Sequence, residues 1–230
     1  MGYGFKVMVW GDYACFTRPE MKVERVSYDV MTPSAARGIL QAIYWKPEIE
    51  WIVDKICVIN PIQFIDIRRN EVSSKISTEK VRSAVNGNDE LLYLDTSFKT
   101  KGFSERQQRA SKVLKNVCYI IEAHFDVNNK SNIEEEKKHY NIALRRMQNG
   151  ECYNQPYLGT REFSANFKLV DNVQISQLKG EVDLGYMLYD LKFKPKCGDI
   201  NYNDAEPMFF RPKMIDGLID VGFYKKEAGL

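Results

Sequence analysis

Apolar and polar side chains alternate along much of the chain in the two-residue period of β-strands. Residues 5–16 are rich in Phe, Val, Trp and Tyr, which favours a strand, and Gly11 within them is expected to form a bulge. Residues 17–30 mix charged and apolar side chains without a period, which predicts an irregular segment. The same pattern predicts further strands over 51–60, 62–69, 91–94, 162–170, 184–194, 208–211 and 214–221.

Two stretches have the period of a helix together with terminal signals. In residues 31–44, Thr32 is a predicted N-cap, Pro33 takes the first helical position, and Pro47 forces an end. The apolar stripe of this helix is Ala36, Ile39, Leu40 and Ile43. In residues 131–148, Ser131 and Glu134 form a predicted capping box. One face of that second helix carries Ile133, Tyr140, Leu144 and Met147. A shorter helix is predicted over 78–85.

Residues 113–125 are apolar on nearly both faces of the predicted strand, so we expect a central strand covered above and below. A basic loop leads into it. Between Lys99 and Lys115 there are six Lys and Arg side chains and one acid, Glu105. Lys115 lies where the apolar pattern starts. Its ammonium either reaches out to water or points at an anion.

The order of the predicted elements approximates βαββαβ, the ferredoxin-like arrangement of RNA-recognition modules. We therefore expect an α+β fold, with a ferredoxin-like RNA-binding and catalytic domain over residues 1–180. The strands predicted from residue 184 onward form a small antiparallel β-sheet in a subdomain over 181–230.

The amino-acid composition narrows the class of protein but does not indicate a function. The 230 residues are 44% hydrophobic and 28% charged, which suits one large domain with a small appendage. The net charge of +2 is too small to indicate nucleic-acid binding by itself. The local cluster of Lys and Arg between residues 99 and 115 is a better indication of it. Five widely spaced cysteines indicate reduced thiols, and we see neither a leader peptide nor a membrane span. We expect a cytoplasmic protein.

Candidate chemistry is sparse. We find no carboxylate pair, Ser/His/Asp set or P-loop with convincing spacing, and two histidines make a multi-histidine metal site improbable. We expect neither a metal nor a cofactor. In the loop 156–161, Gly159 permits a close backbone approach and Arg161 could grip a phosphate. The alternative is an ordinary turn.

A tyrosine combined with lysine suits one reaction in particular. RNA carries its own nucleophile, the 2′-hydroxyl, so a protein can cleave it without a metal. A positioned ammonium stabilises the charge on the phosphorane. A tyrosine hydroxyl or a lysine can move a proton, although imidazole would do so better at neutral pH.

Four segments carry a family resemblance that covers nearly the whole chain. They are FKVMVWGDYACFTRPE, TPSAARGILQAIYWKP, RQQRASKVLKNVCYIIEAHF and YLGTREF. With them the chain resembles the CRISPR-associated Cas5 family of subtype I-C (Dvulg), a RAMP-superfamily group that processes precursor CRISPR RNA. The resemblance implies catalytic roles for Tyr44, at the end of the first helix, and for Lys115. The family's histidine next to that lysine is Asn116 here.

We therefore predict a metal-independent endoribonuclease that cuts CRISPR repeat hairpins by 2′-hydroxyl attack. The resemblance implies that it then stays on the crRNA 5′ handle as a subunit of the type I-C interference complex, and adds double-stranded DNA as a further candidate partner. Predicted RNA contacts are Arg106, Arg109, Lys112 and Arg161. Two alternatives stay open: a non-catalytic subunit that only caps the 5′ handle, and an RNA-binding module of another pathway.

Overall fold

The computed structural model of the chain describes residues 4–21, 23–87, 92, 106–127, 133–172, 175–192 and 205–227. Several sequence predictions lie outside these residues: the strand over 91–94, the first part of the basic loop, the Ser131 half of the capping box, and Cys197. Among the described residues, no helix is long and apolar enough to cross a membrane.

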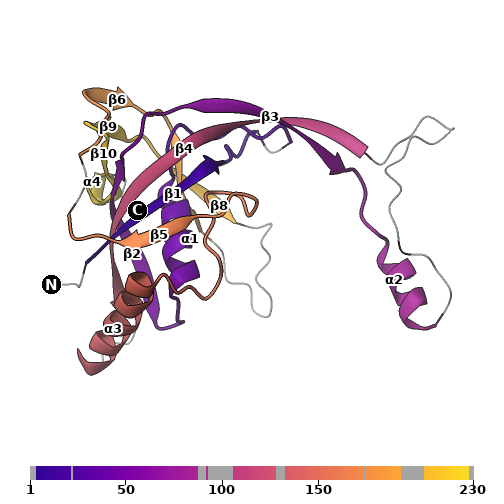
Figure 1. Cartoon of the computed structure of the whole chain (residues 1–230), viewed down its shortest axis with the longest axis horizontal. Coiled ribbons are helices and arrows are strands. Elements are labelled where there is room, and N and C mark those ends of the chain that lie inside the picture. The colour runs from indigo at the N-terminus through magenta and orange to yellow at the C-terminus, as the bar shows by residue number, and fades with distance from the viewer. Residues whose placement is uncertain are drawn as a thin grey trace.

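One mostly antiparallel sheet organises the molecule around a single long strand (Figure 1). This strand, β4 (Arg106–Val127), lies between β1 (Phe5–Ala14) and β2 (Ile49–Val58) and is antiparallel to both. On the far side of β1 lies the short β5 (Asn166–Leu169). The order is thus β5-β1-β4-β2, and the sequence prediction of a central strand over 113–125 is confirmed.

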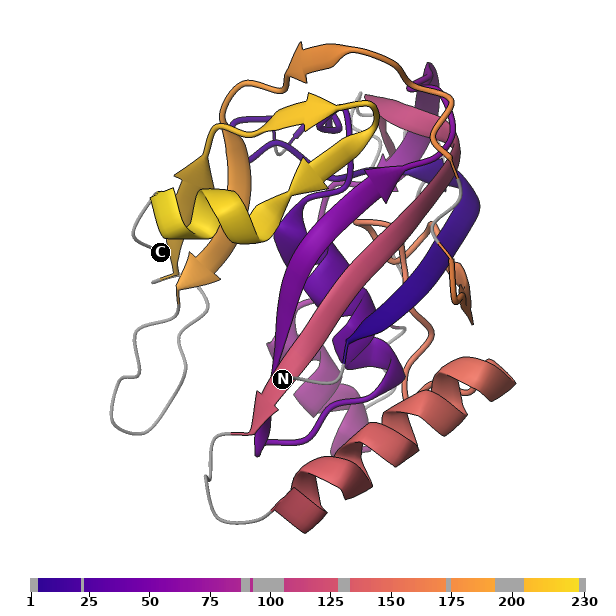
Figure 2. The same cartoon turned by 90° about the vertical axis from the view of Figure 1, so that its left-hand side faces the viewer.

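Two helices cover one face of the sheet. α1 (Pro33–Ile43) lies behind β2 and β4 in Figure 2, and α3 (Ile133–Asn149) packs beside it. Thr32 caps α1 as predicted, because its Oγ1 accepts a hydrogen bond of 3.3 Å from Ala35 N. The predicted apolar stripe of α1 is entirely buried, and it packs against alternate side chains of the three central strands. These helices thus form the second layer of an α+β fold, whose core lies between them and the sheet.

The opposite face of the sheet holds a smaller apolar cluster. It is formed by Met8, Cys57, Ile59 and Ile120, with Trp10, Cys118, Val170 and Leu218 packed against it. A bulge between Val53 and Lys55 in β2 shifts the alternation of that strand.

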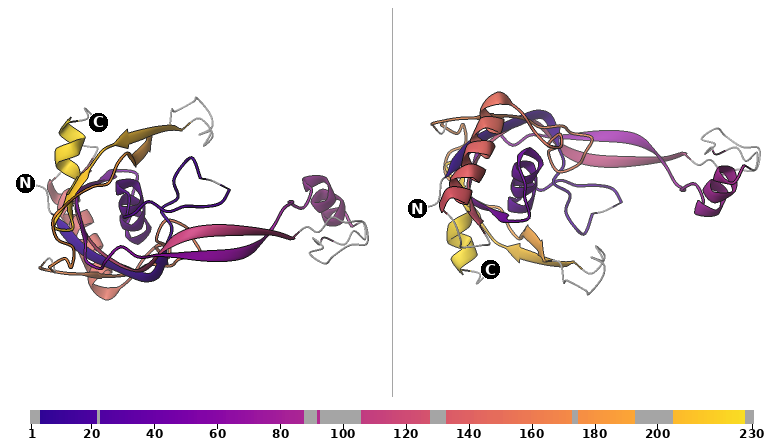
Figure 3. Two further views of the ribbon diagram at one scale, coloured as in Figure 1. Left: turned by 90° about the horizontal axis from the view of Figure 1, so that it is seen from above. Right: turned by 90° about the horizontal axis from the view of Figure 1, so that it is seen from below.

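A two-stranded arm projects from this body (Figures 1 and 3). It consists of β3 (Phe64–Val72) paired with the first half of β4, and α2 (Thr78–Val85) follows β3 at its far end. We predicted a basic loop up to residue 112, but from Arg106 the chain is strand. The physical reason is that residues 106–112 are largely exposed on both faces, so this part of the sequence lacks the apolar alternation that reveals a strand.

The C-terminal part adds short strands in two places. β7 (Met187–Lys192) and β8 (Glu206–Phe210) form a separate hairpin. β6 (Glu181–Asp183), β9 (Lys213–Ile215) and β10 (Leu218–Asp220) extend the main sheet, because β10 pairs with β2. The strand predicted over 214–221 is therefore two strands joined at Asp216–Gly217, with φ of 49° and 80°. The final helix, α4 (Val221–Glu227), was not predicted.

Gly11 corrects another expectation. It pairs in register with Val117 and forms no bulge. A Cβ at this position would come within 2.7 Å of Leu158 Cδ1 and 3.2 Å of Ser164 O. The glycine is therefore explained by the close approach of the loop that contains Leu158, which lies directly against β1.

Candidate active site and nucleic-acid interface

Lys115 and Asn116 lie where the arm joins the body. At Leu114, β4 still pairs with Phe64 of β3 and already pairs with Ala14 of β1. The next two residues are bonded to the segment between β2 and β3: Lys115 N donates to Gln63 O at 2.9 Å, and Asn60 Nδ2 donates to Asn116 O at 2.9 Å. The junction is thus held by hydrogen bonds from the segment between β2 and β3 on one edge and by pairing with β1 on the other.

Asn116 has a left-handed backbone, with φ of 51°. Asparagine is among the few side chains that tolerate this conformation. In a regular strand, Lys115 and Asn116 would point to opposite faces, yet both are exposed here, and Leu114 and Val117 on either side of them are buried. At the kink, both an ammonium and an amide are therefore exposed to solvent.

Tyr13 is the tyrosine that strand pairing brings to Lys115. The two residues are directly opposite in the antiparallel pair of β1 and β4. Directly opposite residues have Cβ atoms roughly 5 Å apart on the same face of a sheet. The Tyr13 ring also contacts Phe163, at 6.0 Å between centroids. Sequence reasoning missed Tyr13, since only the register of β1 against β4 reveals it.

The predicted RNA-binding residues of β4 differ in their surroundings. Lys112 is exposed, with its Nζ 5.1 Å from the centre of the Phe64 ring. Arg106 is exposed at the outer end of the arm. Arg109 is already engaged: its Nε lies 3.5 Å from Glu71, and its Nη2 donates to Gln107 at 3.0 Å.

Arg109 belongs to an ion-pair cluster between the arm and the body. Arg25 lies 3.0 Å from Glu162 and 3.9 Å from Glu71, and Arg69 pairs with the same two carboxylates. Partial burial would raise the pKa of Glu162, but the hydrogen bond and charge of Arg69 outweigh it and lower that pKa. The cluster joins the segment before α1, the arm and the loop that carries Glu162, so it braces the arm against the body.

Tyr44 lies in a different environment, at the C-cap of α1. Its side chain is 1% exposed, and its hydroxyl is 2.7 Å from His139 Nδ1 on α3. Trp51 Nε1 donates to the Tyr44 carbonyl at 2.8 Å, and the Arg146 guanidinium lies 5.3 Å from the centre of the phenol ring. Burial raises the pKa of Tyr44, and Arg146 opposes that rise. The phenol is thus neutral at physiological pH.

The structure does not bring Tyr44 and Lys115 together. Trp51, which holds the Tyr44 carbonyl, pairs with Phe125 of β4, and Lys115 lies ten residues earlier on that strand. Ten strand residues correspond to roughly 30 Å. A direct role for the Tyr44 hydroxyl at a phosphate bound by Lys115 stays a prediction that this arrangement does not favour.

His139 lies on α3 and is the hydrogen-bond partner of the Tyr44 hydroxyl. It is half-buried against Tyr44 because α3 packs on the end of α1. A usable signal was present in the sequence: His139, Ala143 and Arg146 follow the 4-then-3 spacing of one helix face, and Ala143 is fully buried. The other histidine, His124, lies 2.8 Å from Asp54. Among the described residues, no group of three His, Cys, Asp or Glu side chains could hold a metal ion.

Arg161 is exposed on a loop that is fixed to the body. Gly159 has φ of 86°, and a Cβ there would lie 2.1 Å from Cys15 O, so no other residue fits. Cys15 N donates to Leu158 O at 3.0 Å. Arg161 thus projects from a rigid turn far along the chain from Lys115.

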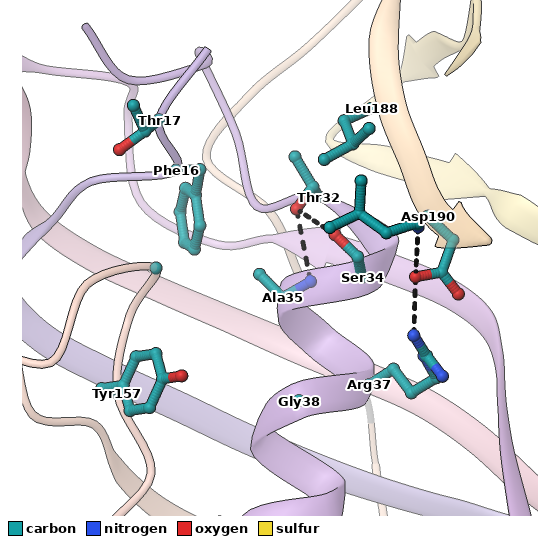
Figure 4. Close-up of a pocket in the computed structure, with 12 residues that line it drawn as sticks. Phe16, Thr17, Thr32, Ser34, Ala35, Arg37, Gly38, Tyr157, Leu188 and Asp190 are labelled. Atoms are coloured by element: carbon teal, nitrogen blue, oxygen red, sulfur yellow. Dashed lines mark hydrogen bonds and ion pairs between the residues drawn. The ribbon is translucent and has the colours of Figure 1, made fainter. Parts of the chain in front are cut away.

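Two hollows flank the loop. One, of about 420 Å³, is shown in Figure 4, where Tyr157 faces α1 across it. Its charged groups neutralise each other, since Arg37 Nη2 lies 2.6 Å from Asp190 Oδ1. The second, of about 680 Å³, lies on the other side of Tyr157 and includes Arg161 in its wall.

Comparison with known proteins points to one family. Residues 4–222 match the model of a family described as CRISPR-associated protein (Cas_Cas5). The chain is 46% identical to the CRISPR pre-crRNA endoribonuclease Cas5d of Mannheimia succiniciproducens, over 99% of both chains. It is 37% identical to the protein of the same name from Thermus thermophilus, over 94% of this chain and 90% of that one.

Solved structures agree with this match. A crystal structure of a CRISPR-associated protein is similar with a TM-score of 0.62 and 25% identity, over 95% of this chain and 91% of that one. The protein SMU1763c from Streptococcus mutans has the same TM-score and coverage at 22% identity, which supports the fold alone. The mixed fold with its mostly antiparallel sheet is therefore shared.

Proposed function

Because this chain belongs to the Cas5 family of CRISPR-associated proteins, in its subtype I-C branch, we propose that it is an endoribonuclease that cleaves precursor CRISPR RNA at its repeat hairpins. The observation that carries the proposal is the 46% identity, over essentially the full length of both chains, to a protein named for that activity. The kink at Asn116 supplies a place for the chemistry, since it exposes Lys115 beside a braced, basic arm.

The reaction needs no metal in this proposal. The 2′-oxygen attacks the adjacent phosphorus, the bond from phosphorus to the 5′-oxygen breaks, and the leaving oxygen takes up a proton as the 2′-hydroxyl loses one. The products are a 2′,3′-cyclic phosphate and a 5′-hydroxyl. Lys115 stabilises the charge on the phosphorane and can donate to the leaving oxygen. Asn116 donates a hydrogen bond from its amide to a phosphate oxygen.

The proposal assigns the two tyrosines to different tasks. Tyr13, opposite Lys115, is the hydroxyl within reach of the same phosphate and orients the 2′-hydroxyl. Tyr44 was predicted for that task, but its hydroxyl is buried and bonded to His139. It therefore contributes by joining α1 to α3.

RNA contacts follow the basic side chains. We assign phosphate contacts to Lys112 and Arg106 on the arm and to Arg161 on the fixed loop, all of which are exposed. Arg109 contributes more through the ion-pair cluster between the arm and the body than as a separate phosphate contact, since Glu71 and Gln107 already engage it. In this assignment the arm holds the hairpin and the kink holds the scissile phosphate.

Fold and partners complete the proposal. The order β5-β1-β4-β2, with helices on one face, supports a ferredoxin-like assignment for residues 1–180. Residues 181–230 form the smaller subdomain, which extends the same sheet through β10. After cleavage the protein stays on the crRNA 5′ handle as a subunit of the type I-C interference complex, with double-stranded DNA as a further partner.

A second function has one observation in its favour. The histidine that the family resemblance implies next to the lysine is Asn116 here, and asparagine cannot transfer a proton. The chain could therefore be a non-catalytic subunit that only binds the 5′ handle.

One experiment separates the two functions. Purified protein is incubated with its cognate repeat RNA in EDTA, beside the same RNA with a single 2′-deoxy nucleotide at the scissile position. We expect cleavage of the first RNA and none of the second, with a cyclic phosphate at the upstream end. A requirement for Mg²⁺, or cleavage of the deoxy RNA, would show the 2′-hydroxyl mechanism to be wrong. Tight binding without any cleavage would favour the non-catalytic function.

A further inference from the structure

A hollow of about 680 Å³ lies between the C-terminal half of α1 and the loop that follows α3. We call it the aromatic groove. Its lining residues are Gly38, Gln41, Ala42, Trp45, Tyr153, Asn154, Gln155, Pro156, Tyr157 and Arg161. Its volume falls within the range of small-molecule binding sites in proteins.

Three large aromatic side chains of this groove remain in contact with solvent. Trp45 is 52% exposed, Tyr153 77% and Tyr157 39%, whereas Trp51 nearby is 2% exposed. Isolated exposed aromatic residues are ordinary, but several around one hollow mark a binding surface. Their flat faces are available for stacking.

The walls of the groove are fixed before any ligand binds. Tyr153 N and Asn154 N both donate to Ala42 O at 3.0 Å, which ties the loop to the end of α1. Gln155 Nε2 donates to Ala165 O at 3.0 Å. At the far end, Gly159 packs against Cys15. A rigid groove loses little conformational entropy on binding.

The charge of the groove selects among ligands. Arg161 is the charged side chain in its wall, and no carboxylate is among the lining residues. Gln41, Asn154 and Gln155 add amides that can both donate and accept hydrogen bonds. A ligand with flat faces, polar edges and a negative backbone satisfies all these features. Unpaired nucleotides have this chemistry, and proteins bind them by aromatic stacking beside cationic side chains.

We propose that the aromatic groove binds unpaired nucleotides of the RNA strand that flanks the hairpin, with bases stacked on Tyr153 and Trp45 and Arg161 on the backbone. This inference rests on the proposed function, because it takes the flanks of the processed RNA as the ligand. It assigns a second contact region to that RNA, separate from the kink that holds the scissile phosphate.

The test measures binding of the full chain to two RNAs that carry a 2′-deoxy nucleotide at the scissile position, so that cleavage is not needed. One is the repeat hairpin with its unpaired flanks, and the other is the hairpin alone. We expect Tyr153→Ala and Trp45→Ala to weaken binding of the flanked RNA roughly 5- to 150-fold, the range for one lost base stack. Binding of the trimmed hairpin should stay the same.

Two controls accompany these variants. Tyr153→Phe keeps the ring and should bind both RNAs like the unmodified protein. Phe223→Ala removes an aromatic side chain that is 55% exposed on α4, away from the groove, and should change neither affinity. Tyr153 is so exposed that its replacement leaves the fold intact.

The outcomes separate this inference from the proposed function. Equal affinities of unmodified protein, Tyr153→Ala and Trp45→Ala for the flanked RNA overturn the groove assignment, and such a result would favour a protein ligand there. Equal losses on both RNAs also overturn it. Failure of cleavage in EDTA, with the flank-specific losses intact, counts against the catalytic function and leaves the groove assignment standing.

Discussion

Two candidate groups of opposite character lie along β4. Near its end, Tyr44 is buried and bonded to His139, with Trp51 and Arg146 around it. Near its middle, Lys115 and Asn116 are exposed at a left-handed kink, with Tyr13 opposite. The first group has its hydrogen bonds satisfied within the protein, whereas the second offers donors to solvent. Tyr44 therefore stabilises the packing of the helices. Lys115 and Asn116 are exposed and can bind a ligand.

The backbone differs between the two regions as well. Tyr44 ends a regular helix with an extended C-cap, and its amide donates to Leu40 O. Asn116 holds a conformation that costs free energy for most side chains, and such strain tends to persist at functional sites. The comparison therefore assigns the chemistry to the kink, and the following changes test it.

The largest effect is expected at Lys115. Lys115→Ala should lower the single-turnover cleavage rate by roughly 10²- to 10³-fold, the cost of one lost transition-state contact. RNA affinity should change little, because the loss of one phosphate contact lowers the salt slope by only about one unit. The cleavage rate is measured in single-turnover reactions with saturating protein. The RNA affinity is measured by binding across a series of salt concentrations.

Lys112→Ala is the matched control, since Lys112 is an exposed lysine three residues earlier on the same strand. It should likewise lower the salt slope by about one unit, but it should leave the saturated rate nearly unchanged. If both lysine variants lose rate and affinity equally, Lys115 is only part of a basic surface.

The two tyrosines give the next largest contrast. Tyr13→Phe should slow cleavage on the order of 10²-fold, because the variant lacks the hydroxyl that orients the 2′-hydroxyl for attack. Tyr44→Phe should instead lower the free energy of unfolding by about 1 kcal/mol, because His139 loses a buried hydrogen-bond partner. That corresponds to a decrease in Tm of about 2–4 °C in a chain of this size.

Thermal unfolding and single-turnover rates of the two variants decide between them. A rate loss of 10²-fold or more in Tyr44→Phe, at unchanged stability, would show that Tyr44 takes part in the cleavage reaction. A Tyr13→Phe variant with the unmodified rate would remove Tyr13 from it.

A smaller effect, and a gain, is expected at Asn116. Asn116→His should accelerate cleavage about 10-fold, a part of the benefit of general acid–base catalysis. Histidine, like asparagine, is comparatively tolerant of the left-handed conformation at this position. The rate profile should show a new titration near neutral pH, where imidazole changes charge. Asn116→Ala is the comparison, and identical rates of all three proteins across pH 6–9 would mean that position 116 has no chemical role.

The contrast also explains how much could be predicted from the sequence. α1 was predicted closely because its cap, its proline and its stripe are local signals, and the structure has it at Pro33–Ile43. The start of β4 was not, since Arg106–Lys112 forms a strand through pairing with β3 and buries almost nothing. When both faces of a strand are exposed to solvent, the hydrophobic pattern of its sequence does not reveal that it pairs with another strand.

The sequence predicted some of the residues of the site, but not how they are arranged in space. Lys115 was located from the sequence because it lies where the apolar pattern starts, but no sequence pattern reveals the left-handed backbone of the next residue, Asn116. The burial of Tyr44 depends on α3, almost a hundred residues further along the chain. Tyr13 becomes visible only through the register of β1 against β4.

The most direct test of the central claim locates the scissile nucleotide on the protein. Once the cleavage position is mapped, an uncleavable repeat RNA with photoreactive 4-thio-2′-deoxyuridine at that position is crosslinked to the full chain, and the labelled peptide is identified by mass spectrometry. The account predicts crosslinks at the kink, within residues 113–117 or at Tyr13 or Gln63. Crosslinks confined to residues 41–45 or 139–146, around Tyr44 and His139, would contradict it.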